Sequence, residues 1–276
     1  SIQILPQSGS DRQYFRVKGM QKTALAAFNT IQKENRTFVD YTQHFLKKGI
    51  NVPELYAQNL EQSIYLLQDL GDLTLLQYLE TERKEGIPSL SAITYYKKAL
   101  AALALMQIEG IQDLNVETYH TPVSFNEQAM LWDLNYFKYC FLKTTKVEFD
   151  EYALEKDFQK LTSYLAQEPQ SFFMFRDFQA RNIMLKDERP YYIDYQSGRK
   201  GALQYDLASL LYQAKAAIPQ DIREKLTDIY IDEVSKLINI DPDKFRSYFY
   251  AYVMLRSMQV LGVYGLRGFF QKKEHF

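Results

Sequence analysis

The chain has 276 residues, of which 46% are hydrophobic, and its formal net charge is -1. This length and composition provide enough apolar side chains for one large domain or for two coupled lobes. The near-neutral charge offers no basic surface for nucleic acid, and the single cysteine excludes an internal disulfide.

The first 70 residues predict a small antiparallel sheet with one helix. Between Glu34 and Lys47, apolar side chains recur at helical spacing, and Gly49 provides a stop at the C-terminal end. Short apolar or alternating runs, separated by turn residues, indicate five strands. These strands are Ile2–Leu5, Tyr14–Val17, Thr23–Phe28, Glu54–Ala57 and Ile64–Gln68.

The rest of the chain is predicted to be mainly helical, with strands returning only between Phe172 and Ile193. The first helix follows Asp72, a residue type that favours the N-cap. The predicted helices are Leu73–Leu79, Ser89–Glu109, Phe125–Leu142, Tyr152–Leu165, Tyr205–Lys215, Asp221–Ile238 and Asp243–Leu261. A short hinge at residues 69–72 divides the chain into an N-terminal part, residues 1–70, and a C-terminal part, residues 71–276.

Nothing in the sequence predicts insertion into a membrane. The longest uninterrupted apolar run, Ala99–Met106, is far shorter than the ~20 residues that span a bilayer. The chain does not open with a charged and then apolar leader. We therefore expect a cytoplasmic protein without a membrane partner.

Three polar residues stand at the ends of apolar runs in the segment from Phe172 to Ile193. Asp177 follows the first run, Asn182 opens the second, and Asp194 ends the third after a polar turn. A hairpin of this length brings the loop before its first strand close to the end of its second. The sequence therefore predicts that Asp177, Asn182 and Asp194 converge, although Asp and Asn also occur as plain turn residues beside hairpins.

Such a set suits phosphoryl transfer from ATP, in which positioning and charge neutralisation by Mg²⁺ do most of the catalytic work. Asp194 and Asn182 offer the hard oxygen ligands that Mg²⁺ prefers. Asp177 would orient the acceptor hydroxyl and take up its proton, a role worth ~10²–10⁴ in rate. We therefore expect Asp177 to be the catalytic residue, and Asn182 and Asp194 to be the metal ligands.

The pattern R-D-x-x-x-x-N, followed by an Asp after an apolar run, resembles the catalytic and metal loops of the protein-kinase-like superfamily. It is most similar to the aminoglycoside/choline phosphotransferase branch. The resemblance implies an α+β bilobal fold, with a small antiparallel β-lobe containing one helix and a larger, mainly helical lobe. It also implies that Asp206, at the start of a later helix, braces the catalytic loop, although Asp206 alone equally fits a first-turn helix acid.

Other segments resemble bacterial anomeric kinases of N-acetylmuramate and N-acetylglucosamine. These segments are S-D-R-x-Y-F-R-V at residues 10–17, Asn51–Ala57, Leu66–Gly71, Asp194–Gln196 and Tyr205–Leu211. The resemblance implies an ATP-dependent and Mg²⁺-dependent kinase whose acceptor is a small molecule, with an amino sugar as the best single candidate. It further implies nucleotide contacts from Ser10, Arg12, Asp69 and Gly71.

Four features depart from the usual kinase. Phe175 replaces the His before Arg-Asp, Gln196 replaces a second acid after the metal Asp, and no G-x-G-x-x-G loop is present. The third strand carries no lysine, since Lys22 stands only at its start. These departures keep open a nucleotide-binding pseudokinase or regulatory module.

The turn at residues 9–12 is a candidate substitute for the missing phosphate-binding features. Successive backbone N–H groups in such a turn can cup phosphate, and Ser10 or Arg12 would add side-chain contacts. An ordinary hairpin turn with a solvated Arg12 explains the spacing equally well. Glu34 is predicted either to bind Arg12 and hold it in place or to be a favourable first-turn acid.

The acceptor is left open by the sequence. Choline is compatible with a chain that has 22 tyrosines, because aromatic cages bind quaternary ammonium groups. Aminoglycosides are polycations that favour an acidic face, and the near-neutral chain offers less support for them.

Overall fold

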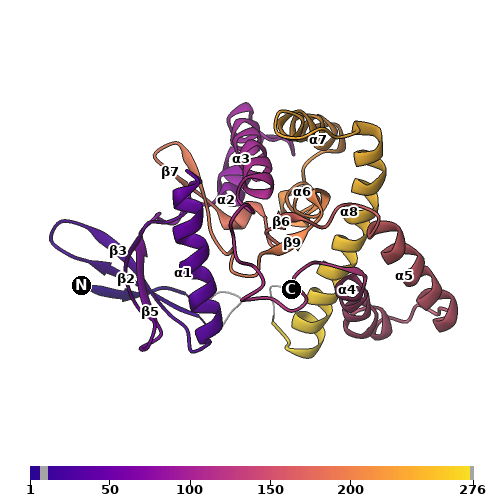
Figure 1. The fold of residues 1–276 in the computed structure, drawn as a ribbon, viewed down its shortest axis with the longest axis horizontal. Helices are drawn as coiled ribbons and strands as arrows, with labels where there is room; N and C mark the ends of the chain where they lie inside the picture. The colour runs from indigo at the N-terminus through magenta and orange to yellow at the C-terminus, as the bar shows by residue number, and fades with distance from the viewer. Residues whose placement is uncertain (7–11, 274–276) are drawn as a thin grey trace.

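The computed structural model describes residues 1–6 and 12–273. Near the N-terminus lies a five-stranded antiparallel sheet in the order β1-β2-β3-β5-β4. The strands are β1 (Ile2–Ile4), β2 (Gln13–Lys18), β3 (Thr23–Phe28), β4 (Leu55–Asn59) and β5 (Ile64–Gln68). One helix, α1 (Gln32–Lys47), lies beside the sheet (Figure 1). All five predicted strands and the predicted helix are therefore confirmed, with small shifts at their ends.

The apolar face of α1 explains its position. Its residues Phe38, Tyr41 and Phe45 are buried, and Gly49 ends the helical segment with a φ of 74°. The Phe38 ring stacks on Tyr65 of β5 with centroids 5.1 Å apart. Since stacked aromatic pairs add to the free energy gained from burial, this contact anchors α1 to the sheet.

The remaining elements are mostly helical and lie at the other end of the molecule (Figure 1). The helices are α2 (Leu75–Glu82), α3 (Leu90–Ile108), α4 (Glu127–Cys140), α5 (Glu151–Leu165), α6 (Leu203–Leu211), α7 (Gln220–Ser235) and α8 (Pro242–Tyr264). Three short 3-10 helices, η1 (Leu142–Thr144), η2 (Ala180–Asn182) and η3 (Ala214–Ala216), and the π-helix η4 (Gly265–Phe270) complete the set. Two strand pairs interrupt them, β6 (Phe172–Met174) with β9 (Arg199–Gly201) and β7 (Ile183–Lys186) with β8 (Arg189–Tyr192). The predicted α+β bilobal architecture is confirmed, whereas β9 was not predicted.

The predicted N-cap of α2 was wrong. Thr74, not Asp72, caps this helix, since its side chain accepts from the backbone N–H of Gln77 at 3.1 Å. Asp72 instead pairs with Arg16 of β2 at 2.8 Å. Asp72 is of a residue type that favours an N-cap, but its carboxylate is bound by an arginine that is distant in the sequence. The division at residue 70 stays a prediction.

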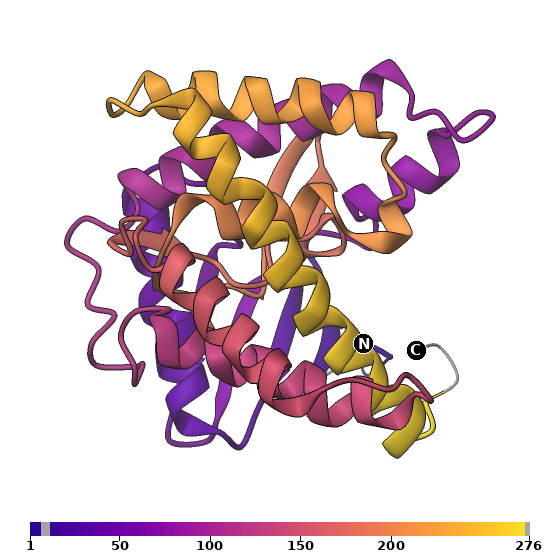
Figure 2. The ribbon, with the colours of Figure 1, turned by 90° about the vertical axis from the view of Figure 1, so that its right-hand side faces the viewer.

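The long helix α8 crosses the helical part diagonally and packs against α4 and α6 (Figure 2). Gly262 and Gly265 make the contact with α4 close: a Cβ atom on Gly265 would lie 1.9 Å from the carbonyl oxygen of Cys140. This contact leaves little freedom for α8 to shift along α4. Among residues 1–6 and 12–273, no helix has the length and apolarity needed to cross a membrane.

Two buried hydrogen bonds join α1 to the segment after Asp194. The Tyr41 hydroxyl donates to the carbonyl of Gly198 at 3.1 Å, and the Thr42 hydroxyl bonds the hydroxyl of Tyr195. The Phe38 and Tyr195 rings also stack, with centroids 5.1 Å apart. The helix of the small lobe is thus attached directly to the segment that carries Asp194.

Candidate active site

Asp206, on α6, holds the backbone of the loop that carries Asp177. The backbone N–H groups of Phe175 and Arg176 donate to the two oxygens of this carboxylate, at 2.6 and 2.9 Å. Arg176 has a φ of 81°, an uncommon conformation for a residue other than glycine. Burial raises the pKa of Asp206 to about 7, against the two N–H donors, which act to lower it. The bracing that the family resemblance implied for Asp206 is confirmed.

Phe175, which replaces the usual His, is part of an aromatic cluster. Its ring is 1% exposed and makes edge contacts with Phe178 at 5.3 Å and with Tyr195 at 6.0 Å between centroids. The substitution therefore exchanges a polar contact for apolar packing between the loop of Asp177 and the segment after Asp194.

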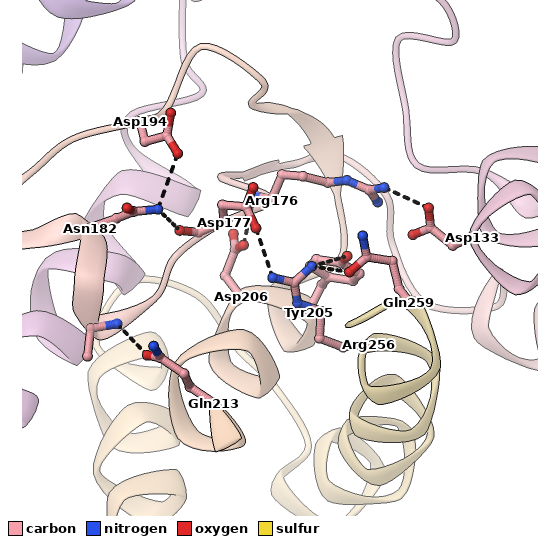
Figure 3. A network of polar contacts seen from close by, with 11 residues as sticks. Asp133, Arg176, Asp177, Asn182, Asp194, Tyr205, Asp206, Gln213, Arg256 and Gln259 are labelled. Atoms are coloured by element: carbon pink, nitrogen blue, oxygen red, sulfur yellow. Dashed lines mark hydrogen bonds and ion pairs between the residues drawn. The ribbon is translucent and has the colours of Figure 1, made fainter. Parts of the chain in front are cut away.

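Asp177, Asn182 and Asp194 lie together, as the sequence predicted (Figure 3). The amide Nδ2 of Asn182 donates to the backbone carbonyl of Asp177 at 2.9 Å and to Oδ2 of Asp194 at 3.3 Å. The first bond fixes the orientation of the amide, because a carbonyl accepts and cannot donate. The convergence is confirmed, and the catalytic and metal-binding roles stay predictions.

The residues around Asp194 fit a magnesium ion. Burial, together with the negative charge of Asp177, raises the pKa of Asp194 above its ordinary value. A divalent cation held by Asp194 would relieve this repulsion, and the amide oxygen of Asn182 is a second hard ligand of the kind that Mg²⁺ prefers. Gln196 donates to Oδ1 of Asp194 at 2.8 Å, so the residue that replaces the second acid orients the first one.

Asp177 is bound by an arginine that the sequence analysis did not identify. Nη2 of Arg256, on α8, lies 2.8 Å from Oδ1 of Asp177 (Figure 3). Burial acts to raise the pKa of Asp177, but the charge of Arg256 and of two neighbouring arginines outweighs it and lowers the pKa below the ordinary value. Asp177 is therefore held as a carboxylate, the form that can accept a proton.

Arg12 enters the site from the small lobe. Its guanidinium is 3% exposed, lies 5.9 Å from the centre of the Phe38 ring, and pairs with Glu34 of α1 at 3.2 Å. The same Glu34 oxygen accepts from Nδ2 of Asn29 at 2.9 Å. The predicted partnership of Glu34 with Arg12 is confirmed, and a solvated Arg12 is excluded. Ser10, the other predicted phosphate contact in this turn, lies outside the described residues.

The hinge residues Asp69 and Gly71 border a pocket of about 520 Å³ between the two lobes. Its lining residues are Lys22, Thr23, Tyr56, Asp69, Leu70, Gly71 and Lys186. The carboxylate of Asp69 accepts from Nε of Arg16 at 2.8 Å and from the backbone N–H of Gly71 at 3.0 Å. Gly71 has a φ of 81°, which a glycine adopts without steric cost.

The β7–β8 hairpin, which supplies Lys186 to the lining of this pocket, is hydrogen-bonded to the hinge. Nζ of Lys186 donates to the backbone carbonyl of Asp69 at 2.6 Å, and the backbone N–H of Leu185 donates to Leu73 at 2.8 Å. Lys186 and Arg16 are site residues that sequence reasoning missed, because a charged side chain in a hairpin or an exposed strand gives no local signal of its partner. For Arg256 the sequence does contain a signal, because this cation lies on the buried face of α8 that also carries Tyr252 and Leu255.

The fold and the convergence of the three polar residues define a kinase-like phosphotransferase architecture. A model of the phosphotransferase enzyme family matches residues 1–247, and the chain belongs to this family. The predicted family resemblance is confirmed.

Curated relatives add a closer comparison. The chain is 26% identical over 226 residues to an N-acetylmuramate/N-acetylglucosamine kinase of Pseudomonas aeruginosa, covering 79% of this chain and 62% of that protein. A protein of the same name from Neisseria meningitidis is 27% identical over 169 residues, covering 60% and 47%. The matched part of the chain thus spans less than two thirds of the length of these relatives.

Solved structures share the fold. The choline kinase LicA from Streptococcus pneumoniae matches with a TM-score of 0.61 at 15% identity, over 100% of this chain and 87% of that one. An ethanolamine kinase from Plasmodium vivax matches with a TM-score of 0.65 at 13% identity, over 97% and 76%. At these identities the likeness concerns the fold alone.

Proposed function

We propose that this protein transfers the γ-phosphoryl group of ATP, with Mg²⁺, to a hydroxyl group of a small molecule. The observation that carries the proposal is the joint position of Asp177, Asn182 and Asp194, linked through one amide group. A proton acceptor and two hard oxygen ligands within one cluster are the groups that phosphoryl transfer requires.

Each polar residue then has a role. Asp177 orients the acceptor hydroxyl and takes its proton, while Asn182 and Asp194 hold Mg²⁺. The ion, when bound, neutralises charge on the phosphates. Arg12, held by Glu34, supports the phosphates from the small lobe together with Ser10. Asp69 and Gly71 shape the hinge pocket that takes the base of ATP.

An amino sugar is the best single acceptor, and the support is the name of the curated relatives, N-acetylmuramate/N-acetylglucosamine kinase. Choline and aminoglycosides stay as alternatives within the same reaction class. We further keep a cytoplasmic location and the lobe boundary at residue 70 as predictions.

The test is ADP release from Mg-ATP with N-acetylglucosamine, N-acetylmuramate, choline and kanamycin as acceptors. The proposal expects turnover above the ATPase background with at least one of them. It also expects that Asp177→Asn lowers this turnover by at least about 10²-fold while the variant remains folded. Full turnover by the Asp177→Asn variant would overturn the proposed role of Asp177.

A second function, a nucleotide-binding regulatory module, is favoured by one observation: β3 carries alanine and leucine where kinases carry a lysine. The same assay separates the two. Saturation with ATP at ~100 Kd stabilises a binding protein by ~2.7 kcal/mol, which a thermal shift detects. A thermal shift without turnover on any acceptor favours the regulatory module.

A further inference from the structure

Arg256 is a buried cation at the wall of the candidate active site. Its side chain is 6% exposed, whereas the Asp177 side chain that it binds is 36% exposed. The arginine therefore reaches from the interior of the helical lobe toward a carboxylate that still faces the cleft. Burying a charge is costly, and a buried ion pair adds little stability compared with apolar packing. A purely structural role consequently gives little reason for a cation at this position.

The surroundings of Arg256 fix the direction of its guanidinium. Nη1 lies 3.4 Å from the hydroxyl oxygen of Tyr205, on α6, and also donates to Oε1 of Gln259, one turn further along α8. The guanidinium carbon lies 5.6 Å from the centre of the Tyr205 ring. These contacts hold the Nη1 side of the guanidinium, and Nη2 binds Asp177 (Figure 3).

The position of α8 is itself fixed. Gly262, one and a half turns beyond Arg256, packs against α4 so closely that a Cβ atom would lie 2.8 Å from the ring of Tyr136. The helix that delivers Arg256 is therefore rigidly packed, as a group that positions a catalytic side chain requires.

Only one oxygen of Asp177 is engaged by Arg256. Within residues 1–6 and 12–273, Oδ1 accepts the bond from Nη2, and no hydrogen bond is found to Oδ2. A carboxylate held at one oxygen loses its rotation about χ2, so the second oxygen has a defined direction.

We propose that Arg256 is a positioning residue for phosphoryl transfer: it holds Oδ1 of Asp177 so that Oδ2 faces the acceptor hydroxyl. This inference rests on the proposed role of Asp177. In the step, the acceptor oxygen forms a bond to the γ-phosphorus, and the bond from that phosphorus to the β,γ-bridging oxygen breaks. The acceptor proton passes to Oδ2 of Asp177, and ADP leaves with the electron pair of the broken bond.

The central test is steady-state kinetics of Arg256→Gln with Mg-ATP and the acceptor of highest turnover in the panel above. Misplacing a reacting group by about 1 Å costs ~10²-fold, so we expect kcat to fall by about that factor while both KM values change less than about threefold. Arg256→Lys keeps the charge but not the planar fork, and we expect it to recover part of the lost kcat. An unchanged kcat in Arg256→Gln overturns the proposal.

Arg246→Gln is the matched control, since Arg246 lies on the same helix and pairs with the surface residue Asp228. We expect its kcat to equal that of the wild type. If Arg256→Gln does not fold, Arg256→Lys decides alone: a kcat lowered at least about tenfold supports the proposal, and a wild-type kcat overturns it.

A double-mutant cycle shows whether Arg256 acts through Asp177. If it does, adding Arg256→Gln to Asp177→Asn lowers the residual rate less than about threefold, and a full additive loss overturns the proposal. The two hypotheses fail differently. Wild-type turnover in Asp177→Asn, or no turnover with any acceptor, rejects the proposed function and this inference with it. A strongly impaired Asp177→Asn beside a fully active Arg256→Gln rejects this inference alone.

Discussion

The guanidinium of Arg12 lies 3.2 Å from the carboxylate of Glu34, so the residue directly before β2 pairs with an acid in the first turn of α1. In protein kinases a lysine on the third strand makes the corresponding pair with a helix glutamate. Here the third strand, β3, reads Thr-Ala-Leu-Ala-Ala-Phe and has no such group. This chain makes an ion pair of a similar kind with an arginine that directly precedes β2.

The first prediction concerns nucleotide affinity. Arg12→Gln removes a buried cation that we place beside the phosphates, and we expect the Kd of Mg-ATP to rise about 10-fold to 100-fold, or about 1.4–2.7 kcal/mol. Isothermal titration calorimetry measures it directly. Lys22→Gln is the comparison, because Lys22 directly precedes β3 and lines the hinge pocket 5.5 Å from the Tyr56 ring, and we expect it to raise the Kd less than Arg12→Gln does. A larger loss in Lys22→Gln than in Arg12→Gln would contradict the substitution of one cation for the other.

The second prediction concerns the two neighbouring carboxylates. Burial and the charge of Asp177 both disfavour the ionised form of Asp194. Asp194→Asn removes this repulsion, so in the presence of EDTA we expect its melting temperature to exceed that of the wild type by a few degrees. The same variant should lose Mg²⁺-dependent turnover and any thermal shift caused by Mg²⁺ together with ATP. An unchanged shift with Mg-ATP would show that Asp194 does not hold the ion.

The third prediction is a pH dependence of stability that arises from Asp206. Its pKa is raised to about 7 in the folded protein from 3.8, so between these values the folded chain keeps a proton that the unfolded chain releases. The contribution of Asp206 to the free energy of unfolding therefore falls as the pH rises from about 4 to about 7. Asp206→Asn removes this contribution, so the wild type should lose stability relative to the variant over that interval.

Chemical denaturation at several pH values measures this difference. Asp221→Asn is the control, since this exposed acid in the first turn of α7 pairs only with Lys225 among the described residues. We expect it to shift stability by less than about 0.5 kcal/mol at any pH. A wild-type advantage over Asp206→Asn that grows with pH would show that the two N–H donors dominate over burial.

The fourth prediction tests the packing that fixes α8. In Gly265→Ala the added Cβ would meet the backbone oxygen of Cys140, which cannot turn away as a side chain can. We expect the free energy of unfolding to fall by at least about 1–3 kcal/mol. Gly19→Ala is the control, because its Cβ comes only to 3.3 Å of the Lys22 oxygen, in the exposed turn between β2 and β3. Equal stability of the two variants would contradict the tight α4–α8 contact.

Local patterns were sufficient to predict most of the fold. Alternation and helical spacing identified β1 to β5 and α1. Of these elements α1, β3 and β5 contain buried residues, whereas β1 is exposed and was identified by its short apolar run alone. The spacing of Asp177, Asn182 and Asp194 predicted their convergence, since a single hairpin connects them. Elements without a one-sided pattern, such as the three-residue strand β9, gave no comparable signal.

Contacts between distant segments could not be read in the same way. Arg256 binds a residue 79 positions away, and Arg16 binds Asp72 at a separation of 56. The N-cap preference of an Asp is worth about 1 kcal/mol, and tertiary contacts override preferences of this size. The sequence therefore predicted the residue types that the site needs, but it did not predict which arginines bind the carboxylates.

The bonds from Tyr41 and Thr42 to the segment after Asp194 have a consequence for how the protein admits its nucleotide. They connect α1 of the small lobe to the segment after Asp194, while Glu34, on the same helix, pairs with Arg12. A swing of the whole small lobe about the hinge would have to break these buried bonds. We therefore expect nucleotide to enter and leave through outward bending of strands β2 and β3 alone, while α1 keeps its position.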